Sequence, residues 1–515
     1  MSRKQGLLTR RSFVAATAAS AAIPILSGAQ EARAQQPKHG GRLRNGFAVG
    51  GSTDRLDPAI MLDNYIKNLN YQVRECLCEL SPDLTATPEL AESWESSDAK
   101  TWRFKLRSGV TFHNGKPFTA EDVIWSINYH RGAESKSQVR TLANQIDDIK
   151  ADGPLNVVFT LKAADADFPL IMTDWHFTIM PADTKDANDG VGTGPYALQQ
   201  WEPGVRALTK KYAGYWRKDR GFFDEVESLV INDATARLNA LLSGQVDVIN
   251  RVPLKTISQV SASPNLKVIN TQGTRGLNLA MLTDAAPYNN PDLREAMKFA
   301  IDRKQIVDNI MQGYGRAGND NPLIPAHRFY NNQLPERPYD PEKARFHLKK
   351  SGMEGQTFEL HTAEVYDGLV DLTQLYQQSA AKAGINIKLT RVPVDGYWRS
   401  VWIKVPFCVS YFASRPSEHV HLSLFYAKGS GLNETKWDHP RFNELLASAR
   451  GELDEAKRKQ MFFEMQKIIV EESGNIVPVW GNYINATSSK VQTPAKVSGA
   501  FENDGDRSSC RWWFA

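Results

Sequence analysis

Hydrophobic and polar side chains alternate most regularly over residues 101–106, TWRFKL, where two aromatic residues and a leucine are separated by arginine and lysine. A period of two predicts a strand with one buried face. After a turn signal at residues 108–109, residues 110–112 are expected to return as a second short strand. Thr119 then predicts a helix N-cap, with Asp122 placed three residues later to complete a capping box. This stretch therefore predicts a hairpin packed against a helix.

Helical and strand patterns follow one another along the rest of the chain. Apolar residues spaced by three or four predict helices over residues 63–80, 233–243 and 441–470, the last broken near Gly451. Residues 358–392 have the pattern of a strand, a helix and a second strand, which implies a parallel pair with a right-handed crossover. Further strands are expected over residues 146–161, 245–248, 276–280 and 476–480. This order predicts an α/β protein.

The first 34 residues have the features of an export signal. Residues 9–14, TRRSFV, resemble a twin-arginine motif, and an apolar run over residues 13–26 follows. Residues 32–34, Ala-Arg-Ala, supply the small side chains of a cleavage site. The apolar run is shorter than the roughly 20 residues that a spanning helix needs. We therefore expect a signal peptide over residues 1–34 and a mature chain that starts at Gln35.

Length and charge narrow the class of protein. A chain of 515 residues exceeds one hydrophobic core, so two or three domains are expected. The net charge of +4 comes from 62 basic and 58 acidic residues. The predicted signal peptide holds five of the basic residues and one of the acidic residues, which accounts for the whole excess. The neutral mature chain argues against a nucleic-acid-binding surface.

Cysteine is rare and scattered, at positions 76, 78, 408 and 510. The pair Cys76 and Cys78 has no second cysteine or histidine pair at metal-site spacing, so a structural zinc site is not expected. An exported protein can form a disulfide, and four cysteines allow three pairings that the sequence does not separate. We expect most of these side chains to be buried thiols.

Several ordered motifs resemble one protein family. LAESWE at 90–95 is followed by the alternating strand and by LRSGVTFHNGKPFTAEDVIWSI at 106–127. Further matches are GTGPY at 192–196, LNALLSGQVDV at 238–248 and the helix from Leu293 to Arg303. This order resembles the extracellular solute-binding proteins of the peptide/nickel class, family 5, which serve ABC importers.

The resemblance implies an α/β, two-lobed periplasmic-binding-protein fold, with mixed sheets flanked by helices and an extra inserted subdomain. After the signal peptide at 1–34, the expected regions are a first segment of lobe I at 35–78, the inserted subdomain at 79–194, a second segment of lobe I at 195–270, lobe II at 271–477 and a C-terminal return to lobe I at 478–515.

The resemblance also implies a function. We expect a monomeric periplasmic protein that captures a small peptide-like, amino-acid-derived or amide solute in a cleft between the lobes. The partner would be an inner-membrane ABC permease with a cytoplasmic ATPase. No cofactor, resident metal or nucleic-acid partner is expected.

The expected ligand site lies around residues 397–419. In the peptide-binding relatives, a loop after a strand carries an acidic residue that pairs with the ligand's α-amino group. Here residues 407–412 are the strand, and Glu418 or His419 falls near the acidic position. Arg415 adds a guanidinium suited to a carboxylate. Three aromatic residues are expected to line the cleft beside these charges: Tyr397, Trp402 and Tyr411.

Three alternatives stay open at this point. His419 and His421 would share a face on a strand, which is half of a metal site, and nickel-binding relatives use a histidine in this region. Uptake of a metal chelate is therefore one alternative. An exported hydrolase is another, although no G-x-S-x-G or H-E-x-x-H motif occurs and we expect no catalytic residues. A periplasmic chaperone or signalling receptor on the same fold is the third.

Overall fold

The computed structural model describes residues 37–413 and 415–515. The predicted signal peptide, with its twin-arginine motif and cleavage site, lies outside the described residues and stays a prediction. Within the described residues, an eleven-stranded mixed sheet has the order β15-β14-β16-β12-β17-β11-β1-β10-β9-β8, and β13 pairs with β17 beside this path. No helix among them is long and apolar enough to cross a membrane.

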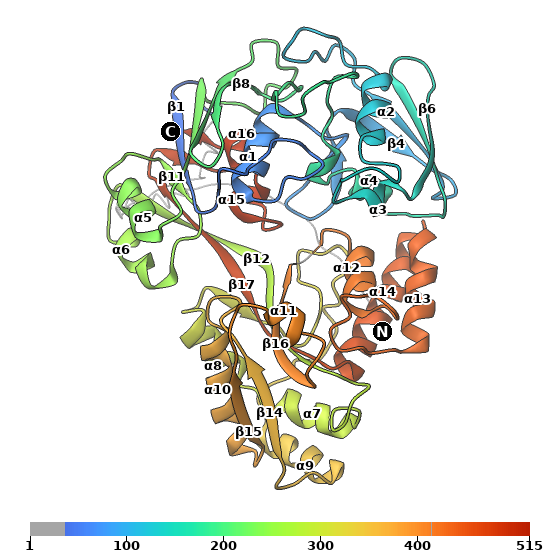
Figure 1. The fold of residues 1–515 in the computed structure, drawn as a ribbon, viewed down its shortest axis with the longest axis vertical. Helices are drawn as coiled ribbons and strands as arrows, with labels where there is room; N and C mark the ends of the chain where they lie inside the picture. Colours follow the sequence, from blue (N-terminus) through green and yellow to red (C-terminus); the bar gives the residue numbers. More distant parts are fainter. Residues whose placement is uncertain (1–36, 414) are drawn as a thin grey trace, which may run out of the picture. The chain divides into compact units, whose positions relative to one another are not determined.

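Two long strands, β12 (Leu266–Met281) and β17 (Asn475–Ser488), lie antiparallel in the middle of this sheet. Figure 1 shows them side by side, connecting the strands on either side. The ladder is irregular between Thr271 and Arg275. A Cβ on Gly273 would lie 2.4 Å from the carbonyl oxygen of Gly481, so the close contact between β12 and β17 leaves no room for a side chain at position 273. The predicted domain boundaries near residues 271 and 478 fall inside these two strands, and the division at those residues stays a prediction.

We call the region built on one side of these strands lobe I. Its strands are β11 (Val248–Ile249), β1 (Arg42–Phe47), β10 (Glu225–Val230), β9 (Arg206–Lys211) and β8 (Tyr196–Glu202). Strand β1 pairs in parallel with both β10 and β11. The helix α5 (Ala234–Leu242) begins at the N-cap Asp233, as the pattern over 233–243 predicts.

The alternating stretch belongs to a separate four-stranded sheet, with the order β4-β5-β7-β6. Its strands are β4 (Ala91–Glu95), β5 (Thr101–Leu106), β7 (Asn156–Leu161) and β6 (Ile146–Ala151). The alternation is confirmed, because Trp102, Phe104 and Leu106 are buried. The capping box of Thr119 and Asp122 at the start of α2 (Ala120–Asn128) is also confirmed.

The predicted strand at residues 110–112 is wrong. The hairpin partner of β5 is β4, and residues 110–112 contribute only an isolated bridge from Thr111 to Pro117. The turn at Asn114 and Gly115 closes this short loop, which leaves too few residues for a ladder. The helix expected over 63–80 is shorter as well: α1 (Asn64–Val73) ends before Arg74, and residues 78–80 form β2 (Cys78–Leu80). The buried Arg74 guanidinium donates to three backbone carbonyls instead.

We call the region on the other side of β12 and β17 lobe II. Its strands are β16 (Phe407–Ala413), β14 (Thr357–Thr362) and β15 (Asn386–Arg391). The predicted β-α-β unit is confirmed: β14 and β15 are parallel and α10 (Leu369–Lys382) connects them. The long helical region is also found, as α13 (Pro440–Gly451) and α14 (Glu455–Glu472) with a break after Gly451.

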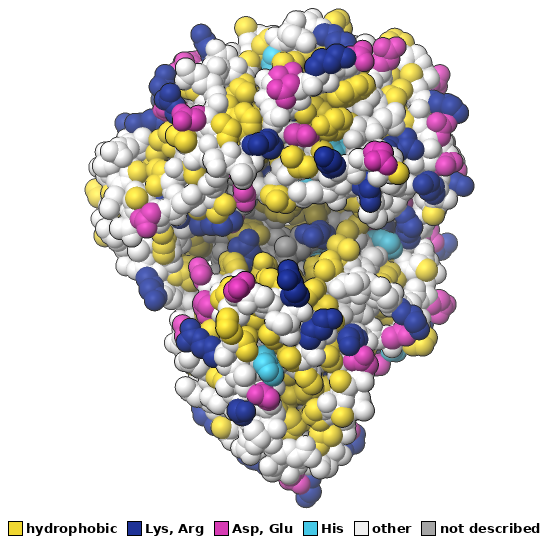
Figure 2. All heavy atoms as spheres, in the orientation of Figure 1, with side chains coloured by type: hydrophobic (Ala, Val, Ile, Leu, Met, Phe, Trp, Pro, Cys, Tyr) yellow, Lys and Arg dark blue, Asp and Glu magenta, His cyan; other side chains and the backbone are white. Residues whose placement is uncertain are grey.

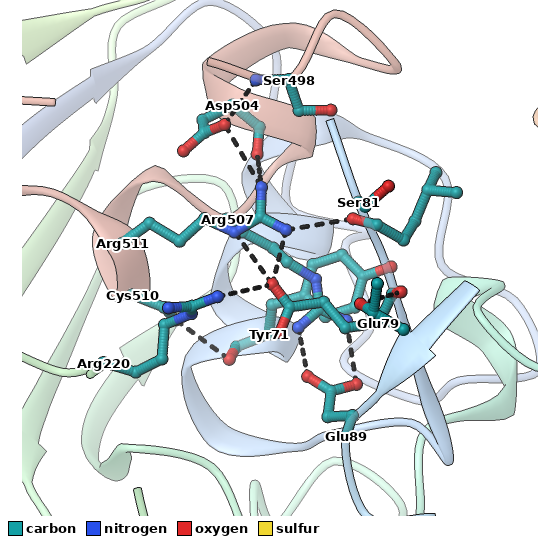
Figure 3. A network of polar contacts seen from close by, with 12 residues as sticks. Tyr71, Glu79, Ser81, Glu89, Arg220, Ser498, Asp504, Arg507, Cys510 and Arg511 are labelled. Atoms are coloured by element: carbon teal, nitrogen blue, oxygen red, sulfur yellow. Dashed lines mark hydrogen bonds and ion pairs between the residues drawn. The ribbon is translucent and has the colours of Figure 1, made fainter. Parts of the chain in front are cut away.

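The residues after β17 return to lobe I, where α15 (Glu502–Gly505), α16 (Ser508–Arg511) and β19 (Trp513–Phe514) pack. A network of buried ion pairs holds this segment (Figure 3). Arg507 pairs with Glu89 and lies over the ring of Tyr71 at 3.8 Å. Arg511 donates to Glu79 at 2.6 Å and to Asp504 at 3.2 Å. All four cysteines are buried free thiols, as expected for most of them.

Candidate functional site

Figure 2 shows a hollow in the face that it draws, beside β12 and β17. In the same orientation, Figure 1 places α1 and α15 above this hollow and α12 (Glu418–Tyr426) next to it. Hydrophobic side chains and the dark-blue basic side chains gather around it. Residues from these elements and from the aromatic loops of lobe II form the candidate site.

Arg275, on β12, connects the two lobes at this site. Its Nη1 donates to the Tyr366 hydroxyl at 2.7 Å, and its guanidinium lies 4.8 Å from the Tyr366 ring centre and 5.5 Å from that of Tyr483. The Glu502 carboxylate, on α15, is 3.9 Å away. Arg251 binds the same carboxylate at 2.8 Å. A fixed guanidinium between two tyrosine rings is thus held at the border of the lobes.

Lys67, on α1, occupies the lobe I side of the site. Its ammonium lies 3.9 Å from the ring centre of Trp175 and 5.4 Å from that of Phe501. Only 8% of the residue is exposed, yet its amine makes no hydrogen bond and no ion pair with another residue in the portion of the chain that the structure describes. Burial lowers the pKa of Lys67, and the field of Asp506 and nearby carboxylates opposes this effect.

The turn that carries Phe501 and Glu502 is strained. Asn503, Asp504 and Asp506 adopt the left-handed conformation, with φ values of 48°, 60° and 61°. Side chains other than glycine seldom take this conformation, and such strain gathers at functional sites. Burial raises the pKa of Asp506 to about 7. Its carboxylate accepts from Asn64 at 2.8 Å.

An aromatic group lies on the lobe II side. The rings of Tyr366 and Tyr411 are 5.5 Å apart, and those of Trp398 and Tyr411 are 5.6 Å apart. Trp402 lies 5.7 Å from Trp398 and donates its indole N–H to Glu434 at 2.9 Å. Trp398 is 43% exposed, so this group keeps an open face. Of the predicted aromatic residues, Trp402 and Tyr411 are therefore brought together.

The other predicted residues lie deeper. The Tyr397 hydroxyl donates to the carbonyl of Val409 at 2.8 Å, and the residue is 1% exposed. Arg415 is half-buried beside the start of α12, and burial lowers its pKa while Asp174 opposes the shift. The buried Glu418 accepts from the backbone N–H of Phe329 at 3.0 Å. His419 donates to the carbonyl of Leu446 at 3.1 Å.

His419 and His421 belong to the helix α12, so they do not share the face of a strand on which half of a metal site would depend. Ser417 is the N-cap of α12 and accepts from the backbone N–H of Val420 at 3.1 Å. His421 lies among aromatic rings, 5.6 Å from Phe412. No group of three histidine, cysteine or acidic side chains among the described residues could hold a metal ion.

Asp167, just before α4 (Phe168–Ile171), connects the four-stranded sheet region to lobe II. Its carboxylate accepts from Arg458 at 2.6 Å, from Arg328 at 3.1 Å and from the hydroxyl of Ser417 at 2.5 Å. Burial raises the pKa of Asp167, but the two guanidinium groups outweigh it and hold the pKa at about 2. A charged Asp167 therefore fixes the start of α12, next to Arg415.

Sequence reasoning missed Lys67, Arg275 and Glu502. No local motif marks them, because they come from three distant segments that meet only in the fold. Arg275 offered one weak signal, a charged residue directly before an apolar strand stretch.

Comparison with known proteins decides the family. The profile of the bacterial extracellular solute-binding proteins, family 5 middle region, matches residues 85–432. The chain belongs to this family. It is therefore a family 5 solute-binding protein of ABC importers, as the sequence motifs predict. Members of this family are binding proteins, found in the periplasm or outside the cell.

Individual relatives of the solute-binding protein bind different solutes. It is 25% identical over 463 residues to the glutathione-binding protein GsiB of Salmonella typhi, covering 86% of this chain and 90% of that protein. The dipeptide-binding protein of Escherichia coli is 26% identical over 436 residues, with 76% and 80% covered. The structure of a nickel ABC transporter protein of Bacillus halodurans superposes with a TM-score of 0.78 at 25% identity, over 90% of this chain and 99% of that one. The two-lobed fold is thereby confirmed.

Proposed function

We propose that this protein is a monomeric periplasmic receptor that captures a small peptide-like, amino-acid-derived or amide solute between its lobes. It then delivers the solute to an inner-membrane ABC permease with a cytoplasmic ATPase. The observation that carries the proposal is the arrangement around the hollow. Arg275 donates to Tyr366 of the aromatic group, beside the two strands that join the lobes, and Lys67 lies against the rings of Trp175 and Phe501. A concave site with aromatic walls and polar groups that fix the orientation of a ligand suits a small solute.

The proposed ligand residues divide into two kinds. Trp402, Tyr411 and Arg415 contact the solute, because the aromatic group keeps an open face and Arg415 begins the loop fixed by Asp167. Glu418 and His419 do not contact the solute but hold α12 in position, since both are buried and form hydrogen bonds with the backbone of neighbouring segments.

Tyr397 holds β16 in the same way, through its hydrogen bond to Val409. Uptake of a metal chelate has less support, because the imidazole of His419 already bonds to the carbonyl of Leu446.

Native mass spectrometry of protein isolated without denaturation tests the proposal. We expect a bound species of small mass, which calorimetry with the stripped protein then confirms as a ligand. The double variant Trp402→Ala/Tyr411→Ala should bind it at least roughly tenfold more weakly, the equivalent of about 1.4 kcal/mol. Phe346→Ala is the matched control, because this aromatic residue is 63% exposed on α9 (Pro341–Ser351). A protein that carries and binds no small solute would overturn the proposal.

A further inference from the structure

We propose that the solute is an organic anion, and that the ammonium of Lys67 binds its carboxylate. This inference rests on the proposed function and adds the chemical class of the solute. It concerns a residue of α1, on the side of the site opposite the aromatic group of lobe II.

The first observation is that Lys67 is a largely buried residue whose ammonium forms no hydrogen bond or ion pair with the described residues. An ammonium group has three N–H donors, and removing them from water without hydrogen bonds is unfavourable. Yet Lys67 is only 8% exposed, and its ammonium has no hydrogen bond or ion pair to another described residue. The rings of Trp175 and Phe501 hold it by cation–π contact, which uses none of the donors in a conventional hydrogen bond. The three donors therefore remain for a solute.

The second observation is that the neighbouring carboxylates are engaged elsewhere. Asp174 accepts from the side chain of His176 at 2.6 Å and from its backbone N–H at 3.0 Å. Glu502 is bound by Arg251 and by Asn250, each at 2.8 Å. These carboxylates influence Lys67 through space, but none forms an ion pair with it in the described structure. Lys67 thus lacks the direct ion pair that buried lysines ordinarily have.

The strained turn supports the same conclusion. Asn503, Asp504 and Asp506 hold left-handed conformations, and this turn places Phe501 against the Lys67 ammonium. The ammonium lies over the ring of Trp175, and the buried indole nitrogen of this ring has no hydrogen-bond partner in the described structure. Strain and unpaired donors at one point are expected where a ligand completes the site.

Matched pairs of compounds test the inference. The probes are dipeptides and N-acyl amino acids, each offered as the free acid and as the corresponding amide, with inorganic phosphate alongside. Thermal shift and calorimetry then compare the wild type with Lys67→Met, which keeps the length of the side chain and removes the charge. Lys67→Arg keeps the charge, and Lys349→Met is the control at an exposed lysine of α9.

We expect the free acids to stabilise and bind the wild type and the amides to bind roughly 30-fold more weakly or worse. Lys67→Met should lose a similar factor for the acids, Lys67→Arg should keep some of the affinity, and Lys349→Met should keep all of it. Circular dichroism confirms that the variants are folded.

Other outcomes separate the two proposals. If the amides bind as well as the acids, or if Lys67→Met binds the acids within about twofold of the wild type, the anion inference is wrong and solute binding stands. If inorganic phosphate binds and none of the carboxylate compounds does, the anion inference is also wrong. If no probe binds and no solute co-purifies, the proposed function fails together with this inference.

Discussion

Removing Arg507 should destabilise the protein strongly. In the network of Figure 3, Arg507 binds Glu89, and the two side chains are 7% and 1% exposed. The Arg507→Met variant would leave the Glu89 carboxylate buried, with the backbone N–H of Cys76 at 3.0 Å as its remaining hydrogen-bond donor. Breaking a buried pair on one side costs about 3–5 kcal/mol. The entropy of unfolding scales with chain length, so for the roughly 480 described residues this loss of free energy corresponds to a fall in Tm of about 3–5 °C.

Differential scanning calorimetry measures this fall, and two further variants define its cause. Arg441→Met removes a similar ion pair, with Glu464 at 2.8 Å, from the surface, where the two side chains are 46% and 45% exposed. We expect no resolvable change there, because exposed pairs contribute little. Adding Glu89→Gln to Arg507→Met should recover much of the loss, since no uncompensated charge remains. If Arg507→Met and Arg441→Met lower Tm equally, or if the double variant shows no recovery, the reasoning is refuted.

Two other predictions concern pH and closure. Burial, together with Glu89, raises the pKa of Glu75 from 4.5 to about 7, so the folded protein holds a proton that the unfolded chain releases. The free energy of unfolding of the wild type should therefore fall as the pH rises from 5 to 8. The stability of Glu75→Gln relative to the wild type should rise over the same interval. A difference in Tm between the two proteins that stays constant with pH contradicts this prediction. Asp167→Ala removes the carboxylate that joins Arg458 and Ser417. We therefore expect a larger radius of gyration in small-angle scattering and faster release of the solute. Unchanged values of both quantities count against the role of Asp167.

Local signals in the sequence predicted local structure well. The alternation over residues 101–106, the capping box at Thr119 and the β-α-β unit each depend on residues close together in the chain. The resemblance places Glu418 and His419 in a loop after the strand at residues 407–412, whereas the structure has them at the start of a helix. Ser417 followed by Glu418 is a local signal for this helix start.

The candidate site was predicted only partially, for a physical reason. Trp402 and Tyr411 belong to one segment, so their position near each other could be expected from the resemblance. Lys67, by contrast, meets Trp175 and Phe501 from segments more than 100 and 400 positions away. Its significance lies in an ammonium that has no hydrogen bond or ion pair among the described residues, which no pattern of residue types along the chain reveals.

The shared strands also determine what can fold alone. Strand β11 pairs with β17 across about 240 positions of sequence, and Ile484 and Ala486 of β17 fill the same hydrophobic core as Leu238 and Val252. A fragment that stopped before β17 would leave this core open and β11 with an unpaired edge, a state prone to aggregation. Such distant pairing also makes folding slow. The lobes divide the binding surfaces between them, while the unit that must be synthesised and folded together is the whole sheet.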